Sequence, residues 1–385
     1  MKKIKLTDIA PYSGNRVQPF YGLKRYMSTG DLNADTPSFE DVTYENRPSR
    51  ADILVSEGDV LFARMAKTNK ALRIDKELDG IIVSTGFSIH KPIEGQLSED
   101  YFLHFLRHDS FHTQKNKLCT GAIQSAISNR SIEKIIVPVI DYDDQLYIAN
   151  ILSRAENLIA QRKESIRLLD EFLKSTFLEM FGDPVRNEKG WEICPLSELG
   201  SLDRGVSRAR PRNSPELLGG IYPLIQTGDV TNSGIYITSY KQTYSEMGLK
   251  QSKLWPKGTM LITIAANIGQ TSILSFDACF PDSVVGFLTN KKKSMVLYVL
   301  FLFKFLQALL ESKASQTAQK NINLGILLNL IVPCPPIELQ IQFSKIVEKT
   351  EALKTQYQQS LRELENLYGS ISQKAFRGEL SFNDK

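Results

Sequence analysis

The sequence predicts an α+β protein with two tandem mixed α/β domains, each followed by a long helix. Two observations lead to this fold class. The 385-residue chain repeats itself when shifted by 195 positions, because Val137-Pro138 then aligns with Val332-Pro333 and Gln145 with Gln340. Each copy of this motif is followed by a long heptad run of apolar residues. A length of 385 residues also suits two or three domains.

The residues upstream of each helix also match, with small changes of offset. Leu6-Thr7-Asp8-Ile9 resembles Leu196-Ser197-Glu198-Leu199 at an offset of 190. Gly58-Asp59-Val60-Leu61 resembles Gly258-Thr259-Met260-Leu261 at 200, and we align Gly86-Phe87 with Gly286-Phe287 at the same offset. The predicted divisions are a first domain over 1–143, a central long helix over 144–182, a linker (183–195) and second domain over 183–336, and a C-terminal helix and tail over 337–385.

Short elements in the first domain follow from composition. Strand-like runs occupy Gly80–Ser84, Phe87–His90 and Ile135–Ile140, with glycines between them. Residues 144–181 predict one helix, since apolar residues recur every three or four positions without an internal Gly or Pro. It ends at Phe181-Gly182-Asp183-Pro184, where glycine accepts the left-handed cap and proline cannot continue the helix. The second helix, over 337–377, ends before Gly378.

A helix of about 35 residues is about 50 Å long, and its apolar stripe needs a partner. We expect the two long helices to pair as an antiparallel coiled coil. The alternative is that each helix packs only on its own domain. The expected subunit or coiled-coil interface consists of Ile148, Ile151, Leu158, Ile166, Leu169, Leu173, Phe343, Ile346, Leu353, Leu361, Leu364 and Tyr368.

Charge is unevenly distributed along the chain. Residues 183–336 hold 16 Lys and Arg against 11 Asp and Glu, whereas residues 1–143 hold 19 of each. The second domain is therefore the basic one, which permits an anionic partner without requiring it.

The four cysteines lie at least 55 residues apart, so we expect free thiols in a reducing compartment and no structural zinc. The N-terminus lacks the apolar core of a signal peptide, which predicts a cytoplasmic protein. The apolar run Met295–Leu310 is interrupted by Lys304 and is shorter than the roughly 20 residues of a membrane span. We predict a buried helix there, with a counterpart over Tyr101–Phe111.

The sequence predicts neither a catalytic site nor a metal site. It contains no GxxxxGK[ST], GxGxxG, HExxH or GxSxG motif. His104, His108 and His112 have the spacing of one helix face, but the other copy has no equivalents, so we favour a solvated or partly buried helix face over a metal site.

Polar residues gather at three kinds of place in each copy, and each kind suits a nucleic acid. They are a loop after the Gly58 or Gly258 strand, a loop before the last strand, and clusters of basic residues. Asn and Gln pair with adenine edges, while Arg suits guanine edges and phosphate. The DNA-binding candidates are Arg16, Lys24, Arg25, Arg64, Lys67, Asn69, Lys70, Thr120, Gln124, Ser125, Arg204, Arg208, Arg210, Asn267, Gln270, Gln316, Thr317, Gln319, Lys320 and Asn321. The alternative for any one of them is a solvated loop side chain.

These features together resemble the specificity subunits of type I restriction–modification systems. Each copy opens with Leu-x-[Asp/Glu]-[Ile/Leu], carries a Gly-Asp-Val-Leu-like strand, and closes with a polar loop, a Val-Pro strand and a long helix that begins near Gln145 or Gln340. The ending Gln373-Lys374-Ala375-Phe376-Arg377-Gly378-Glu379-Leu380 also looks like the family's C-terminus. The first copy departs from the family in having Asp141-Tyr142-Asp143-Asp144 before Gln145, and the second in having Leu339 for an acidic residue.

The resemblance implies two target-recognition domains that read a bipartite double-stranded DNA site, one half-site per domain. It also implies a docking role for the long helices, with two DNA methyltransferase (modification) subunits and with restriction/translocase subunits as partners. S-adenosylmethionine, ATP and Mg would then reside in those partners, and this chain would hold no cofactor and catalyse nothing.

Two other classes of function remain open. A coiled-coil scaffold whose domains never touch DNA would have the same architecture, and salt-dependent DNA binding distinguishes it. A stand-alone nuclease or methyltransferase is disfavoured, because no carboxylate–lysine cluster or methyl-donor loop recurs in both copies.

Overall fold

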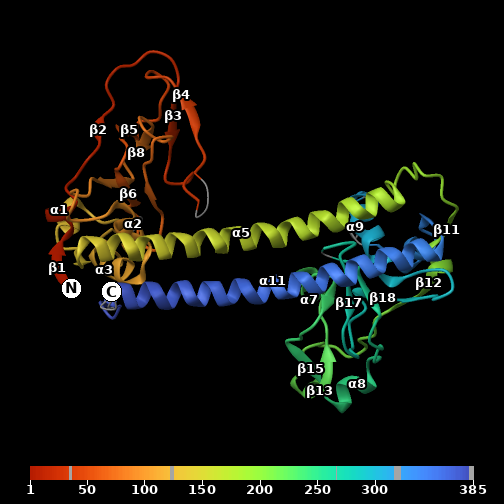
Figure 1. Cartoon of the computed structure of the whole chain (residues 1–385). Helices are drawn as coiled ribbons and strands as arrows, with labels where there is room; N and C mark the ends of the chain where they lie inside the picture. The colour runs from red at the N-terminus through yellow and green to blue at the C-terminus, as the bar shows by residue number, and fades with distance from the viewer. Residues whose placement is uncertain (34–36, 122–124, 266, 316–321, 381–385) are drawn as a thin grey trace. The chain divides into compact units, whose positions relative to one another are not determined.

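A computed structural model describes residues 1–33, 37–121, 125–265, 267–315 and 322–380, without the side chains of residues 313–315. The chain divides into two compact units (Figure 1). The first unit comprises residues 1–165 and 357–385, and the second comprises residues 166–356. Each unit therefore contains one domain and parts of both long helices.

Over its described residues, the first unit combines three sheets with four short helices. The strands are β1 (Lys2–Lys5), β2 (Asn15–Arg16), β3 (Lys24–Met27), β4 (Glu40–Val42), β5 (Ala51–Leu54), β6 (Val60–Ala63), β7 (Ala71–Arg73), β8 (Ile82–Ser84), β9 (Phe87–His90) and β10 (Ile136–Val139). The helices are α1 (Leu6–Ile9), α2 (Glu99–Arg107), α3 (Asp109–Leu118) and α4 (Asn129–Ile132). The sheets have the orders β1-β10, β2-β5-β8-β3-β4 and β7-β6-β9, and among these described strands only β3 and β8 pair in parallel.

The second unit repeats this plan with a different arrangement of sheets. Its strands are β11 (Ile193–Pro195), β12 (Gly200–Arg204), β13 (Leu218–Leu224), β14 (Tyr236–Ile237), β15 (Gln242–Tyr244), β16 (Met260–Thr263), β17 (Thr271–Leu274), β18 (Val284–Thr289) and β19 (Ile331–Pro333). Besides the 20-residue α9 (Val296–Ser315), its helices are the short α6 (Leu196–Leu199), η1 (Pro215–Leu217), α7 (Thr227–Asn232), α8 (Glu246–Lys250) and α10 (Leu324–Leu328). The sheets have the orders β11-β19, β12-β18-β16-β17-β14 and β13-β15. The linker expected over 183–195 thus ends in a strand.

Strand register confirms most of the internal repeat and corrects one part of it. β1 pairs with β10 as β11 pairs with β19, which supports the alignment of Leu6 with Leu196. The hairpin pairs are identical at an offset of 200, because Phe62 faces Ala71 and Ile262 faces Thr271. The next strand differs: Val60 faces His90 and Met260 faces Phe287, an offset of 197. The alignment of Gly86-Phe87 with Gly286-Phe287 was wrong, because the connection before β18 is three residues shorter.

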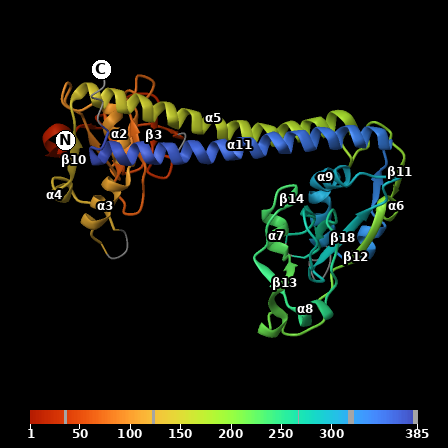
Figure 2. The ribbon, with the colours of Figure 1, turned by 60° about the horizontal axis from the view of Figure 1, so that its bottom comes forward.

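The two long helices are α5 (Tyr142–Phe181) and α11 (Ile337–Arg377), close to the expected bounds. Each ends at a glycine with positive φ, Gly182 at 76° and Gly378 at 74°, as a left-handed cap requires. In each unit the α5 and α11 stretches lie side by side (Figure 1 and Figure 2).

Contacts between α5 and α11 give the direction of pairing within each unit. In the first unit the Tyr368 hydroxyl donates to Glu156 at 2.8 Å. In the second, Lys354 pairs with Asp170 at 2.6 Å, and the rings of Phe177 and Phe343 lie 5.5 Å apart. Because the α11 number falls as the α5 number rises, both stretches are antiparallel, as predicted.

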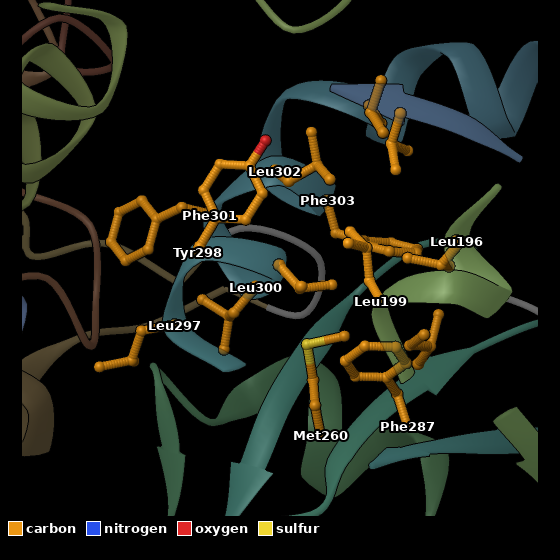
Figure 3. Close-up of a cluster of buried hydrophobic side chains, with 14 of the residues drawn as sticks. Leu196, Leu199, Met260, Phe287, Leu297, Tyr298, Leu300, Phe301, Leu302 and Phe303 are labelled. Carbon is orange, nitrogen blue, oxygen red and sulfur yellow. The ribbon is translucent and has the colours of Figure 1, made fainter. Parts of the chain in front are cut away.

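Each long helix also completes a domain core, which the sequence did not indicate. In the second unit Leu173, Phe177 and Phe181 of α5 join the cluster around α9. Figure 3 shows part of this cluster, where Tyr298, Phe301 and their neighbours on α9 lie above Met260 and Phe287 of the sheet. In the first unit Ala375 and Phe376 of α11 join the cluster of α2 and α3. The alternative in which each helix packs only on its own domain is wrong.

The predicted helix interface is only partly closed within this chain. Ile148, Leu173 and Phe343 are buried, but Leu158 and Leu353 are exposed at 50% and 36%. Those two positions do not belong to a closed seam. An α-helix drifts against a strict heptad repeat, so a fixed spacing does not keep every position on the contact face.

One glutamine attaches each long helix to its domain in the same way. Gln145 is fully buried, accepts the Ser98 N–H at 3.0 Å, and donates to the carbonyls of Gln96 and Ile140, both at 2.9 Å. In the second unit, Gln340 is fully buried and makes three equivalent bonds, accepting the Met295 N–H at 2.9 Å and donating to the carbonyls of Lys293 at 3.3 Å and Pro335 at 2.9 Å.

A charged cluster adds a further link between the α5 and α11 stretches of the first unit. Glu156 accepts from Arg107 at 2.8 Å and from Tyr368, and the His104 Nδ1 lies 3.6 Å away. Burial alone would raise the pKa of Glu156, but His104, Arg107 and Tyr368 together lower it to about 2. The carboxylate is therefore kept ionised in the folded unit.

The histidines do not share one helix face. His108 has an extended backbone, with ψ of 150°, and separates α2 from α3. Its ring accepts the Ser110 N–H, so it acts as the N-cap of α3. The expectation of a single helical histidine stripe was wrong, because spacing alone does not reveal a local cap.

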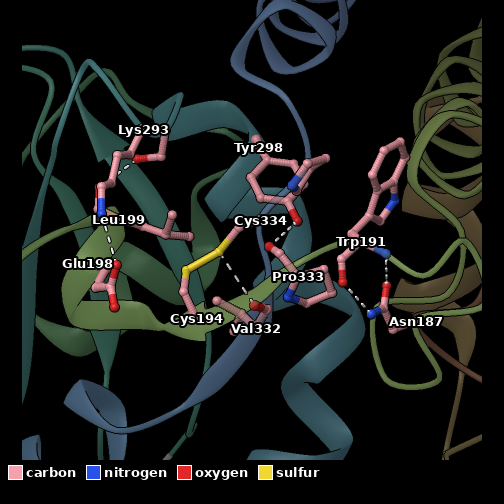
Figure 4. Close-up of a disulfide and its surroundings, with 12 residues drawn as sticks. Asn187, Trp191, Cys194, Glu198, Leu199, Lys293, Tyr298, Val332, Pro333 and Cys334 are labelled. Carbon is pink, nitrogen blue, oxygen red and sulfur yellow. Dashed lines mark hydrogen bonds and ion pairs between the residues drawn. A yellow bond between two sulfur atoms is a disulfide. The ribbon is translucent and has the colours of Figure 1, made fainter.

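Two of the four cysteines form a disulfide, which corrects the expectation of four free thiols. Cys194 is the middle residue of β11 and Cys334 directly follows β19, with Cα atoms 6.4 Å apart (Figure 4). The 140-residue separation in sequence concealed this proximity. Cys119 and Cys279 are free.

The apolar run over 295–310 belongs to a buried helix, as predicted. Residues Leu297 to Phe303 of α9 are each at most 3% exposed. Over the described parts of the chain, no helix is both long enough and apolar enough to cross a membrane.

Candidate nucleic-acid interface

Two of the three predicted places form a single surface in the first unit. The β6–β7 loop comprises Arg64–Lys70, and the α3–α4 segment comprises Cys119–Ser128. The Ile127 N–H donates to the Arg64 carbonyl at 3.0 Å, and the Ala66 N–H donates to Ser125 at 2.8 Å. The hairpin loop and the segment before the last strand therefore present their side chains together.

The second unit repeats this contact. The β16–β17 loop comprises Ile264–Gln270, and the Ile322 N–H donates to the Ile264 carbonyl at 3.0 Å. Ile322 corresponds to Ile127 at an offset of 195, and Ile264 corresponds to Arg64 at 200. The scaffold is thus shared between the units, while the exposed side chains on it differ.

Exposed polar groups of the first surface come mainly from the β6–β7 loop. Lys67 and Asn69 are exposed, and neither side chain has a hydrogen bond or ion pair with another described residue. Thr120 is exposed and Ser125 is half-buried on the neighbouring segment. These groups are available to base edges and phosphates.

Arg64 and Lys70 are engaged inside the unit. Arg64 donates to the Phe87 carbonyl at 2.9 Å and to Asn129 Oδ1 at 2.5 Å, and burial lowers the pKa of its guanidinium. Lys70 donates to the Thr29 carbonyl at 2.7 Å. Both side chains therefore bond to the protein itself and help to fix the shape of the surface.

The remaining basic candidates of the first unit lie on the five-stranded sheet. Arg16 on β2 is highly exposed and pairs with Asp52 at 3.7 Å. On β3, Lys24 lies 5.6 Å from the Phe20 ring centroid, and Arg25 donates to the Glu77 carbonyl. β3 leads to Thr29, which Lys70 holds, so this strand adjoins the loop surface.

In the second unit, Asn267 and Gln270 lie on the β16–β17 loop, where Asn267 is exposed and Gln270 is half-buried. The Asn267 amide donates to the Thr231 hydroxyl at 3.3 Å, which brings α7 beside the loop. The predicted candidates Gln124, Gln316, Thr317, Gln319, Lys320 and Asn321 lie outside the described residues.

The arginines of the second unit fall into two groups. Arg204 and Arg208 are exposed, and their side chains have no hydrogen bond or ion pair within the described part of the chain. Arg210 lies 3.5 Å from Asp282 and donates to the Ser207 and Ala209 carbonyls. Asp282 precedes Ser283, whose carbonyl accepts the Ile264 N–H at 3.2 Å, so this arginine segment adjoins the β16–β17 loop.

Sequence reasoning missed the residues that hold these surfaces in place. Asn129 accepts from Arg64 and, through its carbonyl, from Tyr12. Asp282 accepts from Arg212 at 2.5 Å. The sequence did not single out either residue, because a lone Asn or Asp carries no signal by itself. No cluster of His, Cys, Asp and Glu suited to a metal ion occurs among the residues that the structure describes.

Comparisons with known proteins find similarity to one family. Residues 188–366 match the family model described as the type I restriction modification DNA specificity domain. A curated Methanocaldococcus jannaschii protein, named as the MjaX type I restriction enzyme specificity subunit, is 22% identical over 90% of this chain and 86% of its own length. Together these matches indicate a type I specificity subunit.

Solved structures show that the fold is also shared. A type I restriction–modification S subunit from M. genitalium has a TM-score of 0.63 at 13% identity, covering 97% of this chain and 96% of that one. A chain from a study of complex assembly in the type I R-M system has a TM-score of 0.59 at 21% identity, covering 98% of each chain. At these identities the likeness concerns the fold, namely two mixed domains with long helices.

Proposed function

We propose that this specificity subunit reads a bipartite DNA sequence, with one half-site for each unit. The observation that carries the proposal is the duplicated surface. The same backbone hydrogen bond joins the hairpin loop to the next segment in both units, but the side chains that the two surfaces expose differ. Two units that read different bases need the same backbone scaffold but different exposed polar side chains.

The chemistry of the exposed groups favours DNA. Lys67, Arg204 and Arg208 suit phosphates, and Asn69, Asn267 and Gln270 carry amides that pair with base edges. Phosphate contacts would supply affinity and base contacts would supply sequence preference.

We further propose that the long helices dock two DNA methyltransferase subunits and the restriction subunits. Large apolar side chains on α5 support this, since Leu168 and Phe172 are 48% and 50% exposed. A single exposed apolar side chain is common on a protein surface, but Leu168 and Phe172 are four residues apart and therefore share one helix face. The chemistry, with S-adenosylmethionine, ATP and Mg, would take place in these partners, and the purified chain alone would neither cut nor methylate DNA.

A matched pair of substitutions tests the reading surface. The DNA site is first obtained by mapping methylated adenines in the host genome. Lys67→Ala and Lys76→Ala each remove one exposed positive charge from the first unit. Lys76 lies beyond β7, at the end of the hairpin opposite the β6–β7 loop. In complex with the modification subunit, Lys67→Ala should weaken DNA binding by about 1 kcal/mol more than Lys76→Ala and lower the salt slope by about one.

Equal effects of the two substitutions would show that this loop does not contact DNA. No salt-dependent binding by the unmodified complex would favour a coiled-coil scaffold instead.

A further inference from the structure

The two hairpin loops have the same length and the same closure. The Ala63 N–H donates to the Lys70 carbonyl at 2.9 Å, and the Thr263 N–H donates to the Gln270 carbonyl at 3.0 Å. Each loop, residues 64–70 in the first unit and 264–270 in the second, is therefore closed by an equivalent backbone hydrogen bond. The polar backbone groups inside each loop still need partners, because buried donors and acceptors are almost always satisfied.

In the first unit one buried lysine supplies those partners. Lys115 on α3 is 1% exposed. Its ammonium donates to the Ala63 carbonyl at 3.1 Å, the Thr68 carbonyl at 2.5 Å and the Thr68 hydroxyl at 3.3 Å. Burial lowers the pKa of Lys115 to about 8. A long cation without a carboxylate partner is rarely placed in a core, so its position beneath the loop points to a specific role.

The second unit closes its loop with a different group. Thr263 is fully buried. Its hydroxyl donates to the Asn267 carbonyl and accepts the Gln270 N–H at 3.1 Å. Beneath this loop, in the place that Lys115 takes in the first unit, lies the fully buried Leu310 of α9. At the position of Thr263, offset by 200, stands Ala63.

Because of these exchanges, each loop has a conformation of its own. Ala63 has no hydroxyl with which to hold residue 67, and Leu310 has no ammonium with which to hold carbonyls. The backbone differs accordingly: among the described residues, the positive φ falls at Lys67 (57°) in the first loop and at Gly269 (77°) in the second. Gly269 also faces Leu310, whose Cδ1 lies 3.3 Å from where a Cβ would stand.

We propose that Lys115 and Thr263 are positioning residues that set the conformation of the reading loop in their own unit, and thereby its base preference. The inference rests on the proposed function, since it concerns the half-site that each loop would read. Neither side chain contacts DNA; each acts through the backbone of residues 64–70 or 264–270.

The test uses hydrogen exchange first, without DNA. Lys115→Met keeps the length of the side chain and removes its donors. Thr263→Val keeps the shape and removes the hydroxyl, while Thr263→Ser retains it. Amides of residues 64–70 should exchange at least tenfold faster in Lys115→Met, and amides of 264–270 in Thr263→Val, with the other unit unchanged and Thr263→Ser close to the original protein.

DNA binding by the complex with the modification subunit gives the second readout. Lys115→Met should reduce discrimination against a changed base by about tenfold at one half-site only, and Thr263→Val at the other only. Unchanged loop exchange, or loss of protection throughout a unit, would overturn the inference. Altered loop exchange with equal loss at both half-sites would overturn it as well. If the original complex binds no DNA while loop exchange responds as expected, the proposed function fails and the positioning role stands.

Discussion

Replacing Gln340 by Met should destabilise the second unit strongly. The side chain is fully buried and makes three hydrogen bonds to backbone groups of Met295, Lys293 and Pro335. Met has a similar volume, so the main effect is to leave one N–H and two carbonyls without partners. At about 1–2 kcal/mol for each group, the free energy of unfolding should fall by about 3–6 kcal/mol.

The chain offers a probe and a control for this measurement. Both tryptophans, Trp191 and Trp255, lie in the second unit, so their fluorescence reports its unfolding in urea. With an m-value of about 3 kcal/mol per molar urea, the midpoint should fall by at least about 1 M. Gln342→Met changes an exposed glutamine two residues away and should shift the free energy by less than about 0.5 kcal/mol. Equal shifts in the two variants would refute the role assigned to Gln340.

Three further predictions concern the disulfide, the charged cluster and the paired helices. Cys334→Ser should lower the free energy of unfolding of the second unit by about 2–5 kcal/mol under oxidising conditions, and reductant should abolish the difference from the original protein. Since the pKa of Glu156 is lowered to about 2 from 4.5, its stabilising contribution is complete above pH 4.5 and is lost as pH falls towards 2. Acid titration of unfolding in Glu156→Gln should therefore show a weaker loss over that range, and an unchanged pH profile would count against the cluster. Inserting seven residues after both Lys163 and Ser360 lengthens each helix by about 10.5 Å, so the spacer between methylated half-sites should grow by about three base pairs. An unchanged spacer with full activity would show that the helices do not set it.

The sequence was sufficient to predict the architecture because the repeated residues determine local structure. Gln145 and Gln340 mark the start of each long helix, and Gly182 and Gly378 mark the ends. The apolar stripe required a partner, and the two helices do pair antiparallel in both units.

The spacing of residues in the sequence could not predict the tertiary contacts. The packing of Phe177 and Phe376 into domain cores depends on the antiparallel pairing itself, because each residue lies at the far end of its helix. Cys194 and Cys334 meet only because β11 pairs with β19. The three-residue shift before β18 was hidden because a Gly-Phe pair happens to recur at the wrong offset.

The candidate surface was only partly predictable for a similar reason. Both loops were recognised from their polar residues. The structure joins them in the first unit, and in the second unit Ile322, directly after the predicted loop, bonds to Ile264 of the hairpin loop. Sequence alone does not separate Arg64, which is bonded to Asn129, from Lys67, whose side chain is exposed. The pairs Ala63–Thr263 and Lys115–Leu310 are visible as polar–apolar exchanges in the repeat, but their meaning depends on burial.

The most direct test of the account is an exchange of one whole unit followed by mapping of methylated adenines. Residues 1–165 and 357–385 would be replaced together by those of a related specificity subunit, because both stretches contribute to the core of the first unit. The account predicts that one half of the methylated sequence changes to that of the donor while the other half is retained. A change in both halves, or in neither, would contradict the claim that each unit reads its own half-site.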